Sequence, residues 1–270
     1  MSPQQTPLSQ QTIRFESKDG IARLTLNRPE RLNSFNVQMH GEIREALASV
    51  GRSREVRVLV ITGAGRAFCA GQDLSDRTVA PGQAGTDLAE SIEKHYKPLV
   101  LAVRALAVPV IAAVNGVAAG AGANLALACD LVIAARSASF VQAFSRLGLV
   151  PDTGGTWLLP RLAGNARAMG LALLGEKLGA AQAAEWGLIW KCVEDAELTA
   201  VTDALAGQLA VAPTLGLAKT KQAIYGSWDR SLTAQLDIER DYQGELGRSA
   251  DYAEGVAAFV GKRTPRFSGK

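Results

Sequence analysis

The sequence has few cysteines and histidines. Its 270 residues include three cysteines, Cys69, Cys129 and Cys192, which are too scattered for a disulfide framework or a zinc cluster. We therefore expect reduced thiols in the protein core and no metal site. The two histidines, His40 and His95, belong to no cluster with metal-ligand spacing and are expected to be structural or surface residues.

An excess of charge of one sign is also missing. The formal net charge is +3, and lysine and arginine are dispersed except near the C-terminus, so we expect no nucleic-acid partner. No apolar run reaches the roughly 18 to 20 residues of a membrane span, and residues 1–12 lack the layout of a signal peptide. With 47% apolar residues, the chain can bury the core of one large domain. These features predict a cytoplasmic protein with a flexible tail at 1–12 and no membrane partner.

The chain is organised around the stretch from Val110 to Asp152. Residues 110–114 are predicted to form a buried strand, because they are β-branched and apolar, and residues 121–128 a helix rich in alanine and leucine. The first N–H groups of such a helix have no partner within it. Its N-terminus therefore favours an anion, or an oxyanion formed during catalysis.

The flanking segments predict an α/β fold. A β-hairpin is expected at 13–26, a helix at 37–50 and a buried strand at 56–63, an order that favours parallel strand pairing. A second helix is expected at 88–106, with a kink at Pro98. The C-terminal third is mostly helical in its pattern.

Two glycine-rich turns follow buried strands. The sequences GAGRAF at 63–68 and GAGANL at 120–125 begin like the dinucleotide-binding motif GxGxxG, but both lack its third glycine. A nicotinamide site is therefore the weakest interpretation. The glycines could serve only as tight turns of an α/β core. Alternatively, each turn presents backbone N–H groups to one ligand oxygen.

Five ordered motifs extend over nearly the whole chain. They are LTLNRPERLNSFN, VLVITGAGRAFCAGQDL, PVIAAVNGVAAGAGANLALACDLVIAA, FVQAFSRLGLVPDTGGTWLLPRLAG and EGVAAFVGKRTPRF. With these motifs the sequence resembles the crotonase, or enoyl-CoA hydratase/isomerase, superfamily. The resemblance implies a ClpP-like spiral of ββα units at 13–200 and a C-terminal helical trimerisation region at 201–270. It also implies homo-trimers or hexamers and an acyl-CoA thioester substrate, with coenzyme A as part of the substrate and no separate cofactor.

The resemblance further implies which residues bind the substrate. Two backbone amides polarise the thioester carbonyl in this superfamily, and motif matching assigns them to Gln72 and Ala121. Coenzyme A is expected along residues 27–32 and 72–75, with the C-terminal segment reaching it in its own or a neighbouring subunit. The further substrate-binding candidates are Arg28, Leu32, Ala70, Asp73, Leu74, Gly120, Asn124, Phe144, Phe259 and Lys262. Lys262 has a second interpretation, as a solvated charge at a helix C-terminus.

Members of the superfamily with different activities differ in the carboxylates of their active sites. Its hydratases hold a water between two glutamates, but the matching positions here are Asn124 and Phe144, which exchange no protons. Asp152 matches the acid of several isomerases, and one carboxylate can move a proton between two carbons. We therefore expect an acyl-CoA isomerase. An apolar pocket would raise the pKa of Asp152, whereas N–H groups of residues 153–155 would lower it.

Three alternatives remain open at this point. Asp152 could act only as the N-cap of a helix that begins near Thr156. A hydratase could hold its water between Asp152 and Asn124 in an unfamiliar way. The chain could also be a non-catalytic acyl-CoA-binding subunit that serves as a scaffold.

The remaining acids and tryptophans are expected to be structural. Asp73 belongs to a motif but is expected to shape its turn rather than to react, and Asp130 closes a helix before a strand. Trp157, Trp186 and Trp190 are expected in the core, and Trp157 could also line the acyl pocket.

Overall fold

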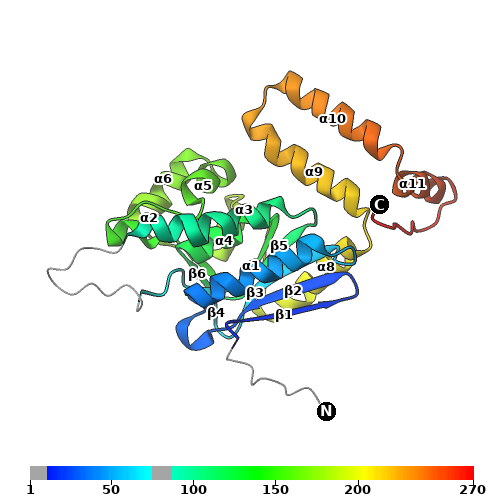
Figure 1. Ribbon diagram of the computed structural model, residues 1–270. Coiled ribbons are helices and arrows are strands. Elements are labelled where there is room, and N and C mark those ends of the chain that lie inside the picture. The colour runs from blue at the N-terminus through cyan, green and yellow to red at the C-terminus, as the bar shows by residue number, and fades with distance from the viewer. Residues whose placement is uncertain (1–10, 75–86) are drawn as a thin grey trace, which may run out of the picture.

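The computed structural model describes residues 11–74 and 87–270. The expected tail at 1–12 therefore lies almost wholly outside the described residues, as does most of the loop that follows Leu74. Figure 1 shows a body of sheets and covering helices, from which the last helices extend to one side.

Two sheets form the core of the described residues. The larger sheet contains, in spatial order, β1 (Ile13–Lys18), β2 (Ile21–Leu26), β3 (Val58–Gly63), β5 (Val110–Val114), β7 (Leu131–Ala135) and β10 (Lys191–Val193). The smaller sheet contains β4 (Ala67–Cys69), β6 (Val117–Ala119), β8 (Ser139–Val141) and β9 (Lys177–Gly179). Pairing is parallel except in the β1–β2 hairpin and between β8 and β9. From β3 to β8, successive strands alternate between the two sheets, and a helical segment follows each pair, which is the ββα spiral that the resemblance implied.

Helices cover both sheets and build the C-terminal part. They are α1 (Val37–Arg52), α2 (Leu88–Ser91), α3 (Lys97–Ala105), α4 (Ala121–Ala128), α5 (Gly155–Ala163), α6 (Asn165–Leu174), α7 (Ala180–Glu185), α8 (Leu198–Ala210), α9 (Thr214–Gly226), α10 (Leu232–Leu246) and α11 (Ala250–Val260). The expected hairpin, the helix after residue 36, the strand 110–114 and the helix 121–128 are all confirmed.

Local sequence explains where α1 begins and which face it buries. The Asn36 side chain accepts a hydrogen bond from the Met39 N–H at 2.8 Å, which satisfies one of the free donors of the first turn. Met39, Ile43 and Leu47 recur at helical spacing and are buried. Helix α4, in contrast, is buried at every residue, so it lies inside the molecule rather than on its surface.

The expected helix at 88–106 is confirmed as contiguous helical segments, with a π-helical turn at Ile92–Tyr96 shortly before Pro98, which lies in the first turn of α3. The kink at Pro98 stays a prediction. One expectation about the tryptophans is wrong. Trp190 is 67% exposed and is not a core residue, whereas Trp157 and Trp186 are partly buried against the core.

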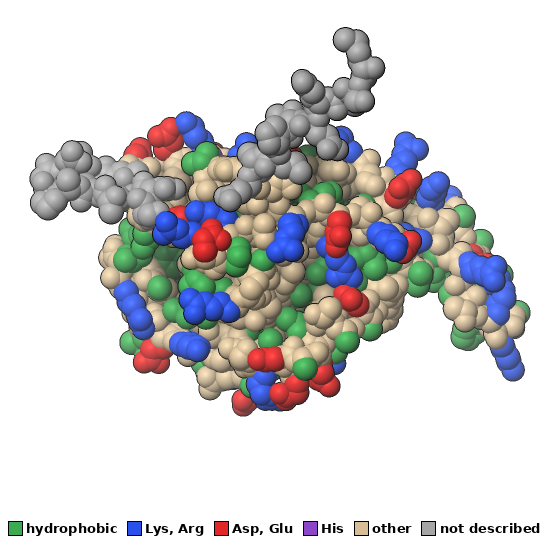
Figure 2. Space-filling model, turned by 90° about the horizontal axis from the view of Figure 1, so that it is seen from below, with side chains coloured by type: hydrophobic (Ala, Val, Ile, Leu, Met, Phe, Trp, Pro, Cys, Tyr) green, Lys and Arg blue, Asp and Glu red, His purple; other side chains and the backbone are tan. Residues whose placement is uncertain are grey.

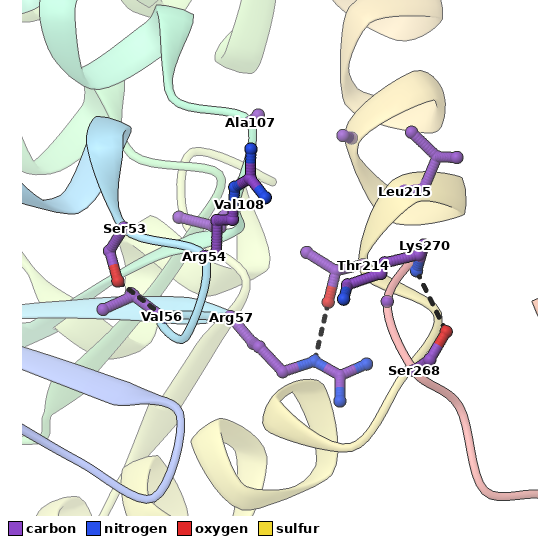
Figure 3. Close-up of a pocket in the computed structure, with 12 residues that line it drawn as sticks. Ser53, Arg54, Val56, Arg57, Ala107, Val108, Thr214, Leu215, Ser268 and Lys270 are labelled. Carbon is purple, nitrogen blue, oxygen red and sulfur yellow. Dashed lines mark hydrogen bonds between the residues drawn. The ribbon is translucent and has the colours of Figure 1, made fainter.

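The C-terminal arm, residues 214–270, is joined to the core at its root. Arg57, just before β3, donates to the Thr214 hydroxyl at 2.8 Å and to the Phe267 carbonyl at 3.1 Å. The buried Asp251 carboxylate accepts the N–H groups of Ser268 and Gly269. Figure 3 shows the pocket of about 370 Å³ between core and arm at this root. Because Arg57 precedes β3, this pocket lies at the end of the sheet away from the turns that follow the strands.

Figure 2 shows basic and acidic side chains interspersed over one face of the molecule. Among the described residues, no single helix has the length and apolarity of a membrane span. Two helical segments, Asp195–Ala210 and Thr214–Asp229, together have the length and composition of a membrane span, but the chain bends by 106° between them.

Candidate active site

The two amides assigned to the oxyanion hole lie on adjacent turns. Gln72 follows β4 and Ala121 begins α4 after β6, and these two strands pair in parallel. A Cβ added to Gly71 would lie 2.8 Å from the Ala119 oxygen and 3.5 Å from the Ala121 nitrogen. The two backbones can approach this closely only because Gly71, with φ +88°, has no side chain.

The strand segment around Gln72 is held by Phe35. The Phe35 N–H donates to the Gly71 carbonyl at 2.7 Å, and the Asp73 N–H donates to the Phe35 carbonyl at 3.0 Å. Because these neighbours of Gln72 both face Phe35, the Gln72 N–H points to the other side of the strand. Within residues 11–74 and 87–270, neither the Gln72 nor the Ala121 N–H has a backbone or side-chain acceptor. Both N–H groups are therefore available to an oxygen acceptor, as the assignment to an oxyanion hole requires.

The Gln72 side chain is fixed by an aromatic cluster that the sequence did not reveal. The buried Tyr96 hydroxyl donates a hydrogen bond to Gln72 Oε1. His40 packs edge-to-face against Tyr96, with ring centroids 4.5 Å apart, and stacks on His95 at 5.1 Å and on Phe35 at 5.0 Å. The two histidines thus lie together in this cluster although they are distant in the sequence.

Cys69 lies directly beneath this turn. Its sulfur accepts the Gly71 N–H at 3.4 Å. Burial raises the pKa of the Cys69 thiol to about 12, and the Gly71 hydrogen bond offsets only part of this. The thiol is therefore protonated and not nucleophilic at neutral pH.

Asp152 lies in a strained turn just before α5. Thr153 has φ +52°, which is unusual for a β-branched residue, and its hydroxyl donates to the Asp152 carboxylate at 2.8 Å. The Gly155 N–H donates to the Asp152 main-chain carbonyl at 2.8 Å. The N-cap position of α5 is occupied by Gly154, two residues after Asp152.

Asn124 connects the Asp152 turn to the oxyanion-hole helix. It lies in the first turn of α4, fully buried, and its Nδ2 donates to the Asp152 carbonyl at 2.8 Å. Gln142 Nε2 donates to Asn124 Oδ1, also at 2.8 Å. A Cβ at Gly155 would lie 2.5 Å from Asn124 Nδ2, so α5 begins in close contact with this amide. Both ends of the Asn124 amide are thus engaged by the protein, and we expect it to hold the turn rather than a water.

Phe144 and Gly120 form an apolar wall beside the amides. The Phe144 ring is buried, and a Cβ on Gly120 would lie 3.5 Å from its Cζ atom. Gly120 has φ +52° and ψ −124°, a conformation that side chains disfavour. The first hydratase position is therefore a structural amide and the second is an aromatic ring.

The remaining candidates near Gln72 surround its turn. Arg28 forms an ion pair with the buried Asp73 at 2.9 Å and donates to the Ser34 carbonyl at 2.6 Å. This ion pair ties the Asp73 turn to the segment that contains Arg28. The Leu32 carbonyl accepts the Ala70 N–H at 2.9 Å, and Leu74 is 55% exposed at the end of the turn.

Phe259 and Lys262 lie apart from this group. Phe259, in α11, is 85% exposed, and Lys262 follows the end of that helix. Figure 1 shows α11 at the far end of the arm, well away from α4. Within one chain, the structure does not bring these two residues to the amide pair.

Comparisons with known proteins agree with this geometry. A family model described as Enoyl-CoA hydratase/isomerase matches residues 16–270. The chain is 61% identical over 251 residues to 1,2-epoxyphenylacetyl-CoA isomerase from Escherichia coli (strain K12), covering 93% of this chain and 96% of that protein. It is 50% identical over 264 residues to a protein of Rhodobacter capsulatus named "Probable enoyl-CoA hydratase", covering 97% and 100%. A crystal structure of enoyl-CoA hydratase from Bacillus anthracis is similar with a TM-score of 0.90 at 33% identity, covering 96% and 100% of the two chains. The chain therefore belongs to the enoyl-CoA hydratase/isomerase family.

Proposed function

We propose that the protein is an acyl-CoA isomerase in which Asp152 is the carboxylate that moves the proton. Its substrate is 2-(1,2-epoxy-1,2-dihydrophenyl)acetyl-CoA, which it converts to the isomeric oxepin-CoA, and it also shifts the double bond of a 3-enoyl-CoA to the 2 position. The 61% identity to a protein named 1,2-epoxyphenylacetyl-CoA isomerase supports this choice of substrate.

The observation that carries the proposal is the state of the two hydratase positions. The Asn124 amide is hydrogen bonded at both ends, to Gln142 and to the Asp152 carbonyl, and Phe144 offers only an aromatic ring. Neither group can activate a water as a general base. Asp152 remains as the acid, and the Asn124 side chain joins its main-chain carbonyl to the first turn of α4.

The chain's own groups then perform the isomerisation in two proton transfers. The N–H groups of Gln72 and Ala121 hold the thioester oxygen and stabilise the negative charge as the enolate forms. The Asp152 carboxylate takes the proton from C2 of a 3-enoyl-CoA and returns it to C4. No atom is gained or lost, so neither water nor a separate cofactor enters the reaction. In the ring epoxide, the same enolate precedes the rearrangement of the ring.

The C-terminal arm completes the proposed substrate site. Coenzyme A lies along the segment of Arg28 and Leu32, and Phe259 and Lys262 contact it in the same or a neighbouring subunit. The chain assembles through the arm as a homo-trimer or a hexamer. The strong exposure of Phe259 at 85% and of Leu232 at 75% supports this, because large apolar side chains in a separate arm favour contact with another subunit.

The test is an isomerase assay with 3-enoyl-CoA, followed by the absorbance of the conjugated 2-enoyl product, with crotonyl-CoA hydration in parallel. We expect isomerisation without hydration at a comparable rate. Asp152→Asn should lower kcat by about 10² to 10⁴-fold, the contribution of a positioned acid/base group, while acyl-CoA binding persists. Near-normal turnover of this variant would remove Asp152 from the mechanism.

Two other results would favour the alternatives. Rapid hydration of crotonyl-CoA would support the hydratase. Tight acyl-CoA binding without turnover of 3-enoyl-CoA or of the ring epoxide would support a scaffold subunit.

A further inference from the structure

The C-terminal arm contacts the helix that follows the Asp152 turn. Trp228 lies in a short 3₁₀ turn, Ser227–Asp229, immediately after α9, and Figure 1 shows that this end of α9 reaches towards α5. The Trp228 ring packs on Trp157 of α5, with centroids 4.5 Å apart and planes inclined by 52°. Trp157 is the third residue of α5 and is itself partly buried against the core. The arm therefore covers the outer side of the helix whose N-terminus follows Asp152.

Two guanidinium groups hold this pair of indoles. Arg104 of α3 lies 4.9 Å from the centroid of Trp157 and 5.3 Å from that of Trp228. Arg161 of α5 lies 4.3 Å and 5.5 Å from the same two rings. Cation–π contacts are strongest where the cation has lost water, and burial lowers the pKa of Arg104, which indicates such desolvation. The contact between arm and core is thus more than the stacking of two rings.

The end of α9 is fixed to the core by further contacts beside this pair. Arg104 also lies 3.5 Å from the centroid of Tyr225, whose hydroxyl donates to Asp130 at 2.5 Å. Lys221 forms an ion pair with Asp130 at 2.8 Å, and Asp130 accepts the Val110 N–H at 2.7 Å. Trp228 is therefore held by a rigid part of the arm, because α9 is tied to α3, to β5 and to the turn after α4.

The side of α5 that faces α4 is also packed against the protein. Asn124 holds the Asp152 carbonyl, and Gly155 has no room for even one added carbon against that amide. Helix α5 is thus in contact with α4 on one side and with Trp228 on the other. A shift of α5 away from α4 would move the Asp152 turn, and the Trp228 contact opposes that shift.

We propose that Trp228 is a positioning residue for Asp152, so that the C-terminal arm sets the geometry of proton transfer through Trp157 and α5. This inference rests on the proposed role of Asp152. It assigns the arm a part in catalysis that is separate from subunit assembly and from any contact with coenzyme A.

The test compares Trp228→Ala and Trp228→Phe with Trp190→Ala, a matched control at an exposed tryptophan outside the arm. We expect Trp228→Ala to lower kcat for 3-enoyl-CoA isomerisation on the order of tenfold or more, because small displacements of a reacting group are costly. Its KM and its binding of butyryl-CoA should change little. Trp228→Phe, which keeps an aromatic ring against Trp157, should recover most of kcat, and Trp190→Ala should match the unaltered protein.

A double variant separates this inference from the proposed function. In the Asp152→Asn background, Trp228→Ala should lower the residual rate no further, because the group that it positions is gone. Full activity of the Asp152→Asn variant would overturn the proposed function itself. An unchanged kcat in Trp228→Ala, or equal losses on both backgrounds, would overturn the positioning role alone. The oligomeric mass of each variant is measured by light scattering, and a kcat loss that follows only a change of mass would also overturn it.

If Trp228→Ala does not fold, Arg104→Gln provides the same test, because it keeps Trp228 and removes the guanidinium beside it. A several-fold loss of kcat at constant KM is expected. A normal kcat would contradict the inference.

Discussion

Replacing Asn124 by alanine tests whether this amide positions the Asp152 turn. The variant removes the donor to the Asp152 carbonyl and the acceptor of Gln142 Nε2, each of which is hydrogen bonded at 2.8 Å. Asn124 is fully buried and Gln142 is 1% exposed, so water does not replace the lost partners without rearrangement. The Asp152 carbonyl keeps the Gly155 N–H, whereas Gln142 Nε2 loses the acceptor that holds it.

The expected magnitudes follow from these two contacts. A buried donor left without an acceptor costs about 1–3 kcal/mol, and the loss at the still-bonded carbonyl lies near the lower end of that range. The free energy of unfolding should therefore fall by about 2–4 kcal/mol, which corresponds to a decrease of roughly 5 to 15 °C in Tm for a domain of this size. Because the Asp152 turn is released, kcat for 3-enoyl-CoA should also fall, by up to about 10²-fold for a displacement near 1 Å.

Three variants separate the possible outcomes. Asn165→Ala, at an exposed position, is the control and should leave both Tm and kcat unchanged. Asn124→Asp keeps the acceptor for Gln142 but turns a buried carboxylate oxygen towards the Asp152 carbonyl, so it should lose kcat with a loss of Tm at least as large as that of Asn124→Ala. A normal kcat in Asn124→Ala, measured on the folded fraction, would refute the positioning argument. A normal Tm would show that the two hydrogen bonds contribute little.

Two further predictions concern the oxyanion turn and the end of the arm. Gly71→Ala places a Cβ about 2.8 Å from the Ala119 oxygen, at a residue whose φ is +88°, so it should displace the Gln72 amide. We expect kcat to fall by about 10² to 10³-fold, the loss typical of one oxyanion donor. Gly170→Ala, in open space on α6, is the control and should leave kcat unchanged in the same assay. The hydrogen bond from Arg263 lowers the pKa of Glu254 from 4.5 to about 2, so the contribution of this carboxylate to holding the arm's end is complete above pH 4.5 and is lost as the pH falls towards 2. An NMR titration of the Glu254 carboxyl should show this midpoint, and a midpoint near 4.5 would contradict the contact.

The elements that sequence could predict are those set by short-range patterns. The strand 110–114 is a continuous apolar run, and the helix beginning at Val37 repeats its apolar residues every three or four positions, so each pattern fixes both the element and its buried face. Of the two glycine-rich turns, only the one at residues 120–125 contains an assigned amide, that of Ala121; Gln72 follows β4 and lies outside the turn at 63–68, so its assignment came only from the resemblance. The spiral arrangement came only from the resemblance, since no local pattern states which strand enters which sheet.

Contacts between distant segments gave no such signal. His40 and Tyr96 meet in the protein although 55 intervening positions separate them in the sequence, and neither belongs to a motif that would relate them. The π turn at Ile92–Tyr96 was equally hidden, because the apolar spacing around it is that of an ordinary helix. In both cases the outcome depends on tertiary packing, which competes with local preference and here overrides it.

At Asn124, matching the sequence to the hydratase pattern leaves a question about activity that the side-chain contacts help to answer. Comparison with the hydratase pattern identifies a lost glutamate, and from that loss alone a weakened hydratase and an isomerase are both possible. The structure adds where the amide atoms point: the donor faces the Asp152 carbonyl and the acceptor faces Gln142. A carboxylate at this position would lack the donor and would place negative charge against a carbonyl oxygen. The same substitution that removes the water-activating group therefore supplies the hydrogen bond that holds the remaining acid, so the two changes are linked by one contact.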